Sequence, residues 1–209
     1  LKPEAGEDGI RLLCAEALAY NFASVCVNPT WVPLCVELLA GSPVKVCTVI
    51  GFPLGATLPA VKAYEAEQVI DLGATEVDMV VALGPIAEDD LAHVAHEVAI
   101  VREAVPDVVL KVIVESALWS TAVLRGVCEA AVDGGADFVK TSTGFHPSGG
   151  ATVEAVAVMR DAVGRRCSVK ASGGIRTLDA CTAMLDAGAD RLGLSATAEI
   201  VAELVRVSR

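Results

Sequence analysis

The sequence predicts an α/β fold, a (β/α)8 TIM barrel of parallel strands, each followed by a helix. Short β-branched runs alternate with longer helical patterns along the whole chain, as expected for repeated βα units. A Gly-Ala step precedes three of the runs, at Gly73, Gly135 and Gly188, and a glycine just past a helix favours a left-handed C-cap. An open doubly wound sheet is the alternative, but the segment 28–31 lacks the glycine-rich first turn typical of that fold.

Seven strands are predicted from β-branched runs bounded by turn residues, at 24–28, 44–51, 76–82, 109–115, 137–142, 167–172 and 191–195. Helical periodicity predicts helices at 5–20, 31–40, 59–72, 88–104, 120–134, 152–163, 177–187 and 196–207. A closed barrel needs eight strands. We therefore expect the first strand to be missing or truncated upstream of Leu1.

The composition predicts one folded domain over residues 1–209. Hydrophobic residues make up 54% of the chain, and no Pro/Ser-rich linker divides it. A net charge of -11 argues against nucleic acid as a partner. No apolar run approaches the ~20 residues that span a bilayer, so no membrane association is expected. Seven scattered cysteines without a C-x-x-C pair indicate reduced thiols and a cytoplasmic protein.

Lysine occurs inside three of the predicted strands, as Lys111, Lys140 and Lys170. A fully buried lysine is costly unless it is paired or functional. Near the carboxyl end of a barrel strand, inward side chains face the active-site mouth. We expect Lys140 and Lys170 to lower each other's pKa there, because a neighbouring cation favours the neutral amine that attacks a carbonyl. Lys111 lies earlier on its strand and is expected to pair with an interior carboxylate.

Asp78 is an acidic residue in a strand that is otherwise apolar. With Lys170 it could transfer the proton of the carbon that becomes an enamine. A purely structural alternative is that the strand lysines pair with Asp78 or Glu115 and do no chemistry. Asp78 can both balance the lysine charge and transfer a proton, so for this residue the two roles are compatible.

Glycine clusters at the ends of the last three strands predict a phosphate site. Glycine lets the backbone approach an anion, and phosphate sites recur at the late strands of barrels. A helix N-terminus predicted at Thr177 would also favour an anion. The predicted phosphate residues are Gly144, Gly173, Gly174, Gly193 and Ser195.

Three other candidates have weaker support. His93 and His96 are three residues apart on a predicted helix, but two ligands do not make a metal site, and no metal is expected. Cys26 ends a predicted strand near the expected pocket. No basic neighbour in the sequence indicates an activated thiol there.

Several segments resemble the deoxyribose-phosphate aldolase family, and the resemblance runs along almost the whole chain. The two most specific segments are Asp137-Phe138-Val139-Lys140-Thr141-Ser142-Thr143-Gly144-Phe145 and Val169-Lys170-Ala171-Ser172-Gly173-Gly174-Ile175-Arg176. Further similar segments are 1–5, 23–29, 46–55 and 76–80.

The resemblance implies a class I aldolase that reversibly cleaves 2-deoxy-D-ribose 5-phosphate to acetaldehyde and D-glyceraldehyde 3-phosphate, without metal or organic cofactor. It implies that Lys140 forms the Schiff base, that Lys170 lowers its pKa, and that Asp78 assists proton transfer. The five phosphate residues named above would hold the phosphate. Two departures are Ala82-Leu83-Gly84 in place of Asn-Ile-Gly, and Leu194-Ser195-Ala196-Thr197 in place of Thr-Ser-Ser-Gly, which removes a hydroxyl.

Two other functions fit the same residues. One is an aldolase or isomerase acting on another small phosphorylated carbonyl compound. The second is a barrel that binds a phosphosugar without catalysis. Exposed apolar helix faces in so hydrophobic a chain further suggest a homodimer or a larger homo-oligomer.

Overall fold

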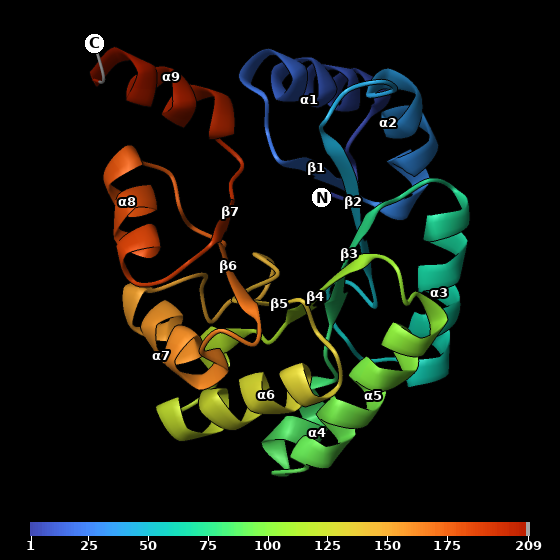
Figure 1. The fold of residues 1–209 in the computed structure, drawn as a ribbon, viewed down its shortest axis with the longest axis vertical. Coiled ribbons are helices and arrows are strands. Elements are labelled where there is room, and N and C mark those ends of the chain that lie inside the picture. Colours follow the sequence, from blue (N-terminus) through green and yellow to red (C-terminus); the bar gives the residue numbers. More distant parts are fainter. Residues whose placement is uncertain (208–209) are drawn as a thin grey trace.

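A computed structural model describes residues 1–207 of the chain. Its strands form a strongly curled sheet that is surrounded by helices (Figure 1). The strands are β1 (Ser24–Val27), β2 (Lys45–Ile50), β3 (Glu76–Val80), β4 (Val109–Ile113), β5 (Phe138–Lys140), β6 (Ser168–Ser172) and β7 (Arg191–Gly193). All seven strands were predicted, and each is one to three residues shorter than expected.

Strand order follows chain order from β1 to β7, and every pair is parallel. A doubly wound sheet would reverse its strand order partway, so that alternative is wrong. Within residues 1–207, β1 and β7 each have one hydrogen-bonded neighbour, and the arc stays open between them (Figure 1). The fold is a TIM-barrel-like sheet that has seven of the eight strands.

The helices lie on the convex side of the sheet, as in a barrel (Figure 1). They are α1 (Glu7–Tyr20), α2 (Val32–Leu38), α3 (Pro59–Asp71), α4 (Leu83–Ala87), α5 (Leu91–Ala104), α6 (Thr121–Asp133), α7 (Val153–Val163), α8 (Leu178–Asp186) and α9 (Thr197–Val207), with short 3-10 turns η1 (Pro29–Trp31) and η2 (Ser116–Leu118).

The predicted helix 88–104 begins later than expected. Asp90 caps α5 by accepting a hydrogen bond from the His93 N–H, and a cap of this kind marks a helix start. Asp89 just before it has a positive φ of 62°, which separates α5 from α4. The predicted helix 31–40 is also shorter than expected, because Trp31 belongs to the 3-10 turn η1 and α2 spans only Val32–Leu38.

The repeated Gly-Ala steps close helices as predicted. After α3, Gly73 has a φ of 102°, the Gly73 N–H bonds to the Ile70 carbonyl, and the Ala74 N–H bonds to the Val69 carbonyl. This is the Schellman pattern, which satisfies the last carbonyls of a helix and turns the chain into the next strand. Gly135 and Gly188 have the same positive φ, at 99° and 111°.

The apolar core fills the layer between the sheet and the helices, whereas charged side chains occupy the concave side. Val77, Val112 and Val169 are fully buried toward the helices. Lys111, Lys140 and Asp78 are also buried, at 0–3% relative exposure. Because successive side chains alternate between faces, the strands separate an apolar outer layer from a polar interior.

A buried ion pair connects α3 and α5 to the end of β3. Lys62 Nζ lies 2.7 Å from Glu97 Oε2 and donates to the Val80 carbonyl at 2.8 Å. The Glu97 Oε1 accepts a hydrogen bond from the Ala82 N–H at 2.7 Å. Both side chains are fully buried. The pair thus fixes the backbone where β3 leaves the sheet.

We expect Lys62→Met to lower the free energy of unfolding by about 3–5 kcal/mol, because the Glu97 carboxylate is left buried without its cation. Urea unfolding followed by circular dichroism measures this loss. The double variant Lys62→Met/Glu97→Leu should recover part of it, since both buried charges are then removed. An unchanged unfolding midpoint in the single variant would contradict this role.

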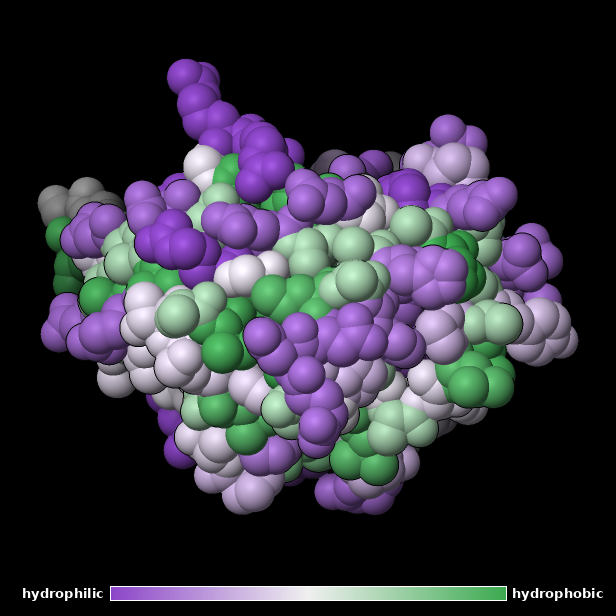
Figure 2. All heavy atoms as spheres, turned by 90° about the horizontal axis from the view of Figure 1, so that it is seen from below, coloured by the Kyte–Doolittle hydropathy of each residue, from purple (hydrophilic) through white to green (hydrophobic). Residues whose placement is uncertain are grey.

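Hydrophobic side chains on the face seen in Figure 2 are divided into separate patches by hydrophilic ones. The larger exposed apolar residues of the chain include Leu54, Leu58, Val61 and Tyr64, at 48–71% exposure in and before α3. Among the described residues, every helix is too short or too polar to cross a bilayer.

Candidate active site

Asp78 is the centre of a cluster of three buried lysines. Its Oδ2 lies 2.7 Å from Lys140 Nζ and 2.7 Å from Lys170 Nζ. Its Oδ1 lies 2.9 Å from Lys111 Nζ. The structure therefore brings together the three residues predicted for catalysis, and it pairs Lys111 with a carboxylate as expected.

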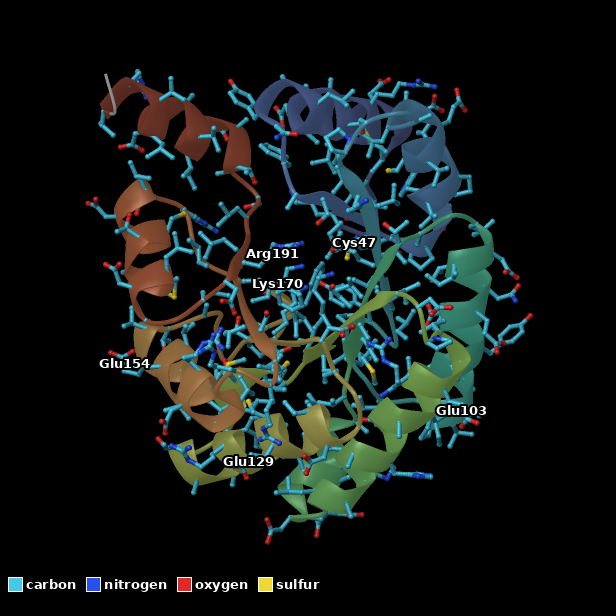
Figure 3. All side chains as sticks on the ribbon, in the orientation of Figure 1. Cys47, Glu103, Glu129, Glu154, Lys170 and Arg191 are labelled. Atoms are coloured by element: carbon cyan, nitrogen blue, oxygen red, sulfur yellow. The ribbon has the colours of Figure 1, made fainter. Side chains whose placement is uncertain are left out.

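The strand register explains why these side chains meet. Asp78 on β3 is opposite Lys111 on β4, Lys140 on β5 is opposite Lys170 on β6, and Lys170 is opposite Arg191 on β7. Side chains at matched positions of parallel strands point to the same face. Figure 3 shows Lys170 and Arg191 on the concave side of the sheet.

Glu76 is a second carboxylate of the cluster, and it pairs with two of the basic side chains. It lies 2.7 Å from Lys111 Nζ and 3.3 Å from Arg191 Nη1. Arg191 also lies over the Phe138 ring, 5.4 Å from its centroid, at a distance typical of a cation–π contact. Neither Glu76 nor Arg191 was predicted as a site residue. Their only sequence signal is a charge within a short strand.

The carboxylate changes the expected electrostatics of the lysines. Burial disfavours the charged form of Lys170, but attraction to Asp78, Cys47 and Cys26 together outweighs burial and raises the pKa of this amine. The expectation that a neighbouring lysine lowers it is therefore wrong for Lys170, because a carboxylate stands between the two amines. Burial favours the neutral form of Asp78, yet the charges of Lys140, Lys170 and Lys111 hold its pKa well below the usual value.

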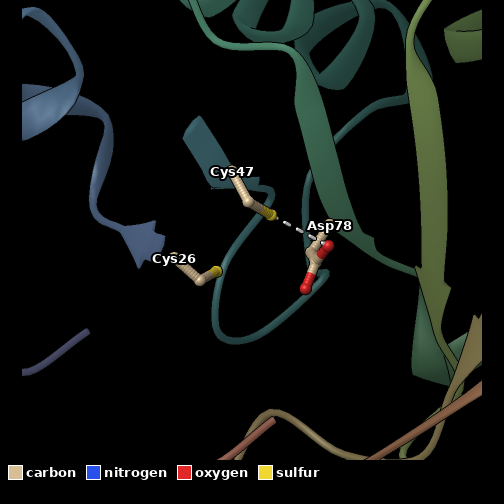
Figure 4. A group of neighbouring side chains, drawn as sticks. All are labelled: Cys26, Cys47 and Asp78. Carbon is tan, nitrogen blue, oxygen red and sulfur yellow. Dashed lines mark hydrogen bonds between the residues drawn. The ribbon is translucent and has the colours of Figure 1, made fainter. Parts of the chain in front are cut away.

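Two thiols lie beside this cluster. Cys26 on β1 is opposite Cys47 on β2, and the Cys47 thiol donates to Asp78 Oδ1 at 3.2 Å (Figure 4). The hydrogen bond with Cys47 is the main cause that lowers the pKa of Cys26 to about 6, and Lys170 and Lys140 lower it further. The Cys26 thiol therefore has two basic neighbours, Lys140 and Lys170. No basic neighbour was expected from the sequence, because these lysines lie more than a hundred residues away along the chain.

The predicted phosphate glycines form two groups. A Cβ added to Gly173 would lie 3.7 Å from Gly144 Cα and 3.0 Å from Gly150 Cα, so these three loops converge. A Cβ on Gly193 would lie 2.9 Å from Ser172 Cβ and 3.3 Å from Lys170 Cε, so Gly193 borders the lysine cluster.

Several members of the predicted phosphate site adopt a backbone that only glycine tolerates well. Gly144, Gly173 and Gly174 have φ values of 82°, 89° and 81°, in the left-handed region. Gly174 and Ser195 are exposed. Gly150 was not predicted as a site residue, but its Cα packs against the Gly173 backbone.

Glu115 holds the loop that follows Lys140. Its carboxylate accepts a hydrogen bond from the Thr143 hydroxyl at 2.6 Å and another from the Thr143 N–H at 3.2 Å. Glu115 is 1% exposed and has a positive φ of 50°, which is uncommon for a residue other than glycine. It therefore fixes the loop between the lysine strand and Gly144, rather than pairing with a lysine.

The histidines are away from this cluster. His96 is exposed and His93 is half-buried on α5. His93 lines a surface groove together with Leu54 and Leu58.

The fold and the site define a class of protein: a TIM-barrel-like enzyme whose polar interior holds lysine amines at one carboxylate. The model of the DeoC/LacD family aldolases matches residues 2–200 of the chain. The chain belongs to this family and is a lyase.

Similar proteins agree with this assignment. The deoxyribose-phosphate aldolase of Halalkalibacterium halodurans is 54% identical over 203 residues, which cover 96% of this chain and 90% of that protein. The tetrameric deoxyribose phosphate aldolase of Aeropyrum pernix has a TM-score of 0.87 and 33% identity, and the match covers 99% of this chain and 87% of that one. An aldolase designated QR15 has a TM-score of 0.93 and 37% identity, with 99% and 92% coverage.

Proposed function

We propose that this chain reversibly cleaves 2-deoxy-D-ribose 5-phosphate into acetaldehyde and D-glyceraldehyde 3-phosphate. Two lysines that share the buried Asp78 carboxylate are the main support for this activity. The family match and the names of relatives about 50% identical over most of the chain indicate the substrate.

In the first stage, the Lys140 amine adds to the C1 aldehyde of the open-chain sugar, and loss of water gives a protonated imine. The attacking amine must be neutral. Asp78 Oδ2 lies 2.7 Å from this nitrogen and from that of Lys170, so the carboxylate is positioned to accept its proton and the charged Lys170 amine is positioned to donate one.

In the second stage, the bond between C2 and C3 breaks. Its electron pair enters the imine and forms an enamine, the C3 hydroxyl loses its proton, and C3 becomes the aldehyde of D-glyceraldehyde 3-phosphate. Protonation of the enamine at C2 and hydrolysis of the imine then release acetaldehyde and restore Lys140. The Asp78–Lys170 pair lies next to Lys140 Nζ and would transfer the protons of these steps.

The phosphate would be held beside the lysine cluster by Gly144, Gly173, Gly174, Gly193 and Ser195. Free backbone N–H groups in a glycine-rich turn bind phosphate without a cationic side chain. This suits a protein with a net charge of -11, because the global field does not attract an anion.

Borohydride trapping tests this function directly. The protein is incubated with acetaldehyde, reduced, digested and analysed by mass spectrometry. We expect one adduct of a reduced two-carbon imine on Lys140. An adduct on Lys170 alone would reverse the roles of the two lysines, and no adduct would favour a barrel that only binds a phosphosugar.

We expect Gly173→Ala to raise the KM for deoxyribose 5-phosphate by about tenfold, equal to about 1.4 kcal/mol. A methyl group at a φ of 89° is strained, and it would lie 3.0 Å from Gly150 Cα. Steady-state kinetics measures the KM, and acetaldehyde trapping at the lysine should remain. Gly164→Ala is a matched control, because Gly164 also has a positive φ of 55° but no atom would lie within 4 Å of its Cβ. A KM that rises equally in both variants would contradict a local effect.

The remaining properties are proposed on indirect support. We propose a single domain that acts as a homo-oligomer in the cytoplasm on small phosphorylated sugars and aldehydes. The relative from Aeropyrum pernix is described as tetrameric, and the exposed apolar side chains around Leu54 and Tyr64 are candidates for the contact between copies. Sedimentation equilibrium gives the mass, and a monomer at micromolar concentration would contradict this assembly.

A further inference from the structure

The thiols of Cys26 and Cys47 and the carboxylate of Asp78 form a compact group of three donors. Their ligand atoms all lie within 4.8 Å of one another (Figure 4). We propose that these three residues bind a soft divalent cation, such as Zn2+ or Cd2+, and that its binding inhibits the enzyme.

The donor chemistry favours a soft cation. Thiolates select zinc-like ions over magnesium and calcium, and a carboxylate is a common additional ligand. Cys26 is only half-buried, so an ion can reach the pair from solvent, and a fourth coordination position remains free. Register fixes the Cys26 and Cys47 backbones side by side on β1 and β2, so small side-chain rotations suffice to close the ligand shell.

The two oxygens of the Asp78 carboxylate have different partners. Lys140 and Lys170 both contact Asp78 Oδ2. The Cys47 thiol instead donates to Oδ1 at 3.2 Å. Lys111 Nζ lies 3.4 Å from Cys47 Sγ and 2.9 Å from Oδ1. A cation between Sγ and Oδ1 therefore replaces the thiol proton and displaces this amine.

The charge balance also permits the ion. Lys111 Nζ is close to Oδ1, but it has a second carboxylate in Glu76 at 2.7 Å, to which it can move. A divalent cation bound by two thiolates and one carboxylate forms a complex with a net charge of about -1, which the surrounding lysines can balance. Metal binding coupled to release of thiol protons is the usual behaviour of cysteine sites.

The position of the ion on Asp78 predicts inhibition. The predicted inhibition rests on the proposed function. A cation on Oδ1 withdraws electron density from Asp78. The carboxylate then accepts protons from Lys140 and Lys170 less readily. Binding of the ion does not depend on the proposed function.

Cadmium titration of the metal-free protein tests the site, because thiolate-to-cadmium charge transfer absorbs in the ultraviolet. We expect one Cd2+ per chain by calorimetry, a charge-transfer band, and loss of aldolase activity that EDTA restores. Cys26→Ala and Cys47→Ala should each weaken binding at least tenfold. Cys26→Ala alters a partly exposed side chain, so the test stands if Cys47→Ala does not fold.

Cys14→Ala is the matched control. Cys14 and Cys35 form another thiol pair, with their sulfurs 3.8 Å apart, but both are buried in the apolar core. The affinity of the Cys14→Ala variant for Cd2+ should equal that of the original chain. Equal affinity in Cys26→Ala and Cys47→Ala, or the absence of a charge-transfer band, would overturn the site. Binding without loss of activity would overturn the inhibition alone.

Discussion

Lys140→Leu is expected to reduce the cleavage of deoxyribose 5-phosphate by at least about 10⁴-fold, because the proposed covalent intermediate has no other amine at that position. Lys170 lies on the same carboxylate oxygen, but its pKa is raised, so it is a poor substitute nucleophile near neutral pH. A coupled assay of D-glyceraldehyde 3-phosphate formation measures the loss.

The fold of this variant should remain intact. Asp78 keeps two cations, Lys111 and Lys170, and leucine suits a buried strand position. Circular dichroism should match the original spectrum. Lys45→Leu, which changes an exposed lysine on β2, serves as the control and should retain activity. More than about a hundredth of the original turnover in Lys140→Leu would exclude Lys140 as the nucleophile.

Asp78→Asn is expected to lower the free energy of unfolding by about 3–5 kcal/mol, since Lys140 and Lys170 are left buried without a carboxylate. Activity should also fall, by about 10²–10⁴-fold, because the proton carrier is lost. Urea unfolding and the cleavage assay measure the two effects. Asp161→Asn is the control, because the Arg125–Asp161 pair is exposed and such pairs contribute about 0–1 kcal/mol.

The difference between Asp78→Asn and the original chain should depend on pH. Lysines lower the pKa of Asp78 in the folded state, so its stabilising contribution is present above the unfolded pKa of about 4. That contribution is lost as the pH falls from there toward the folded pKa. The two unfolding free energies should therefore converge in acid. A constant difference between pH 7 and pH 3 would show that the charge of Asp78 is not the cause.

The sequence was sufficient to predict the barrel and the three central residues, because both depend on local patterns. Alternation along a strand identifies Lys140 and Lys170 as inward-facing. The partners of these residues depend on register between strands, which local patterns do not specify. Cys47, Glu76 and Arg191 were missed for this reason.

Lys62 and Glu97 were missed for a different reason. Each lies on an amphipathic helix, where a charged residue normally indicates the solvent face. Both side chains are buried because two backbone groups at and just beyond the end of β3, the Val80 carbonyl and the Ala82 N–H, need hydrogen-bond partners. That need arises from the tertiary structure and has no signature in either helix.

The buried Lys62–Glu97 pair also links helix packing to the geometry of the substrate site. It holds the backbone at Val80 and Ala82, at and just beyond the end of the strand that carries Asp78. A shift of this backbone would move the Asp78 carboxylate relative to the amines of Lys140 and Lys170, which lie 2.7 Å from it. Misplacement of a reacting group by about 1 Å can cost about 100-fold in rate. Lys62→Met should therefore slow cleavage as well as destabilise the fold, although neither residue of the pair belongs to the lysine cluster.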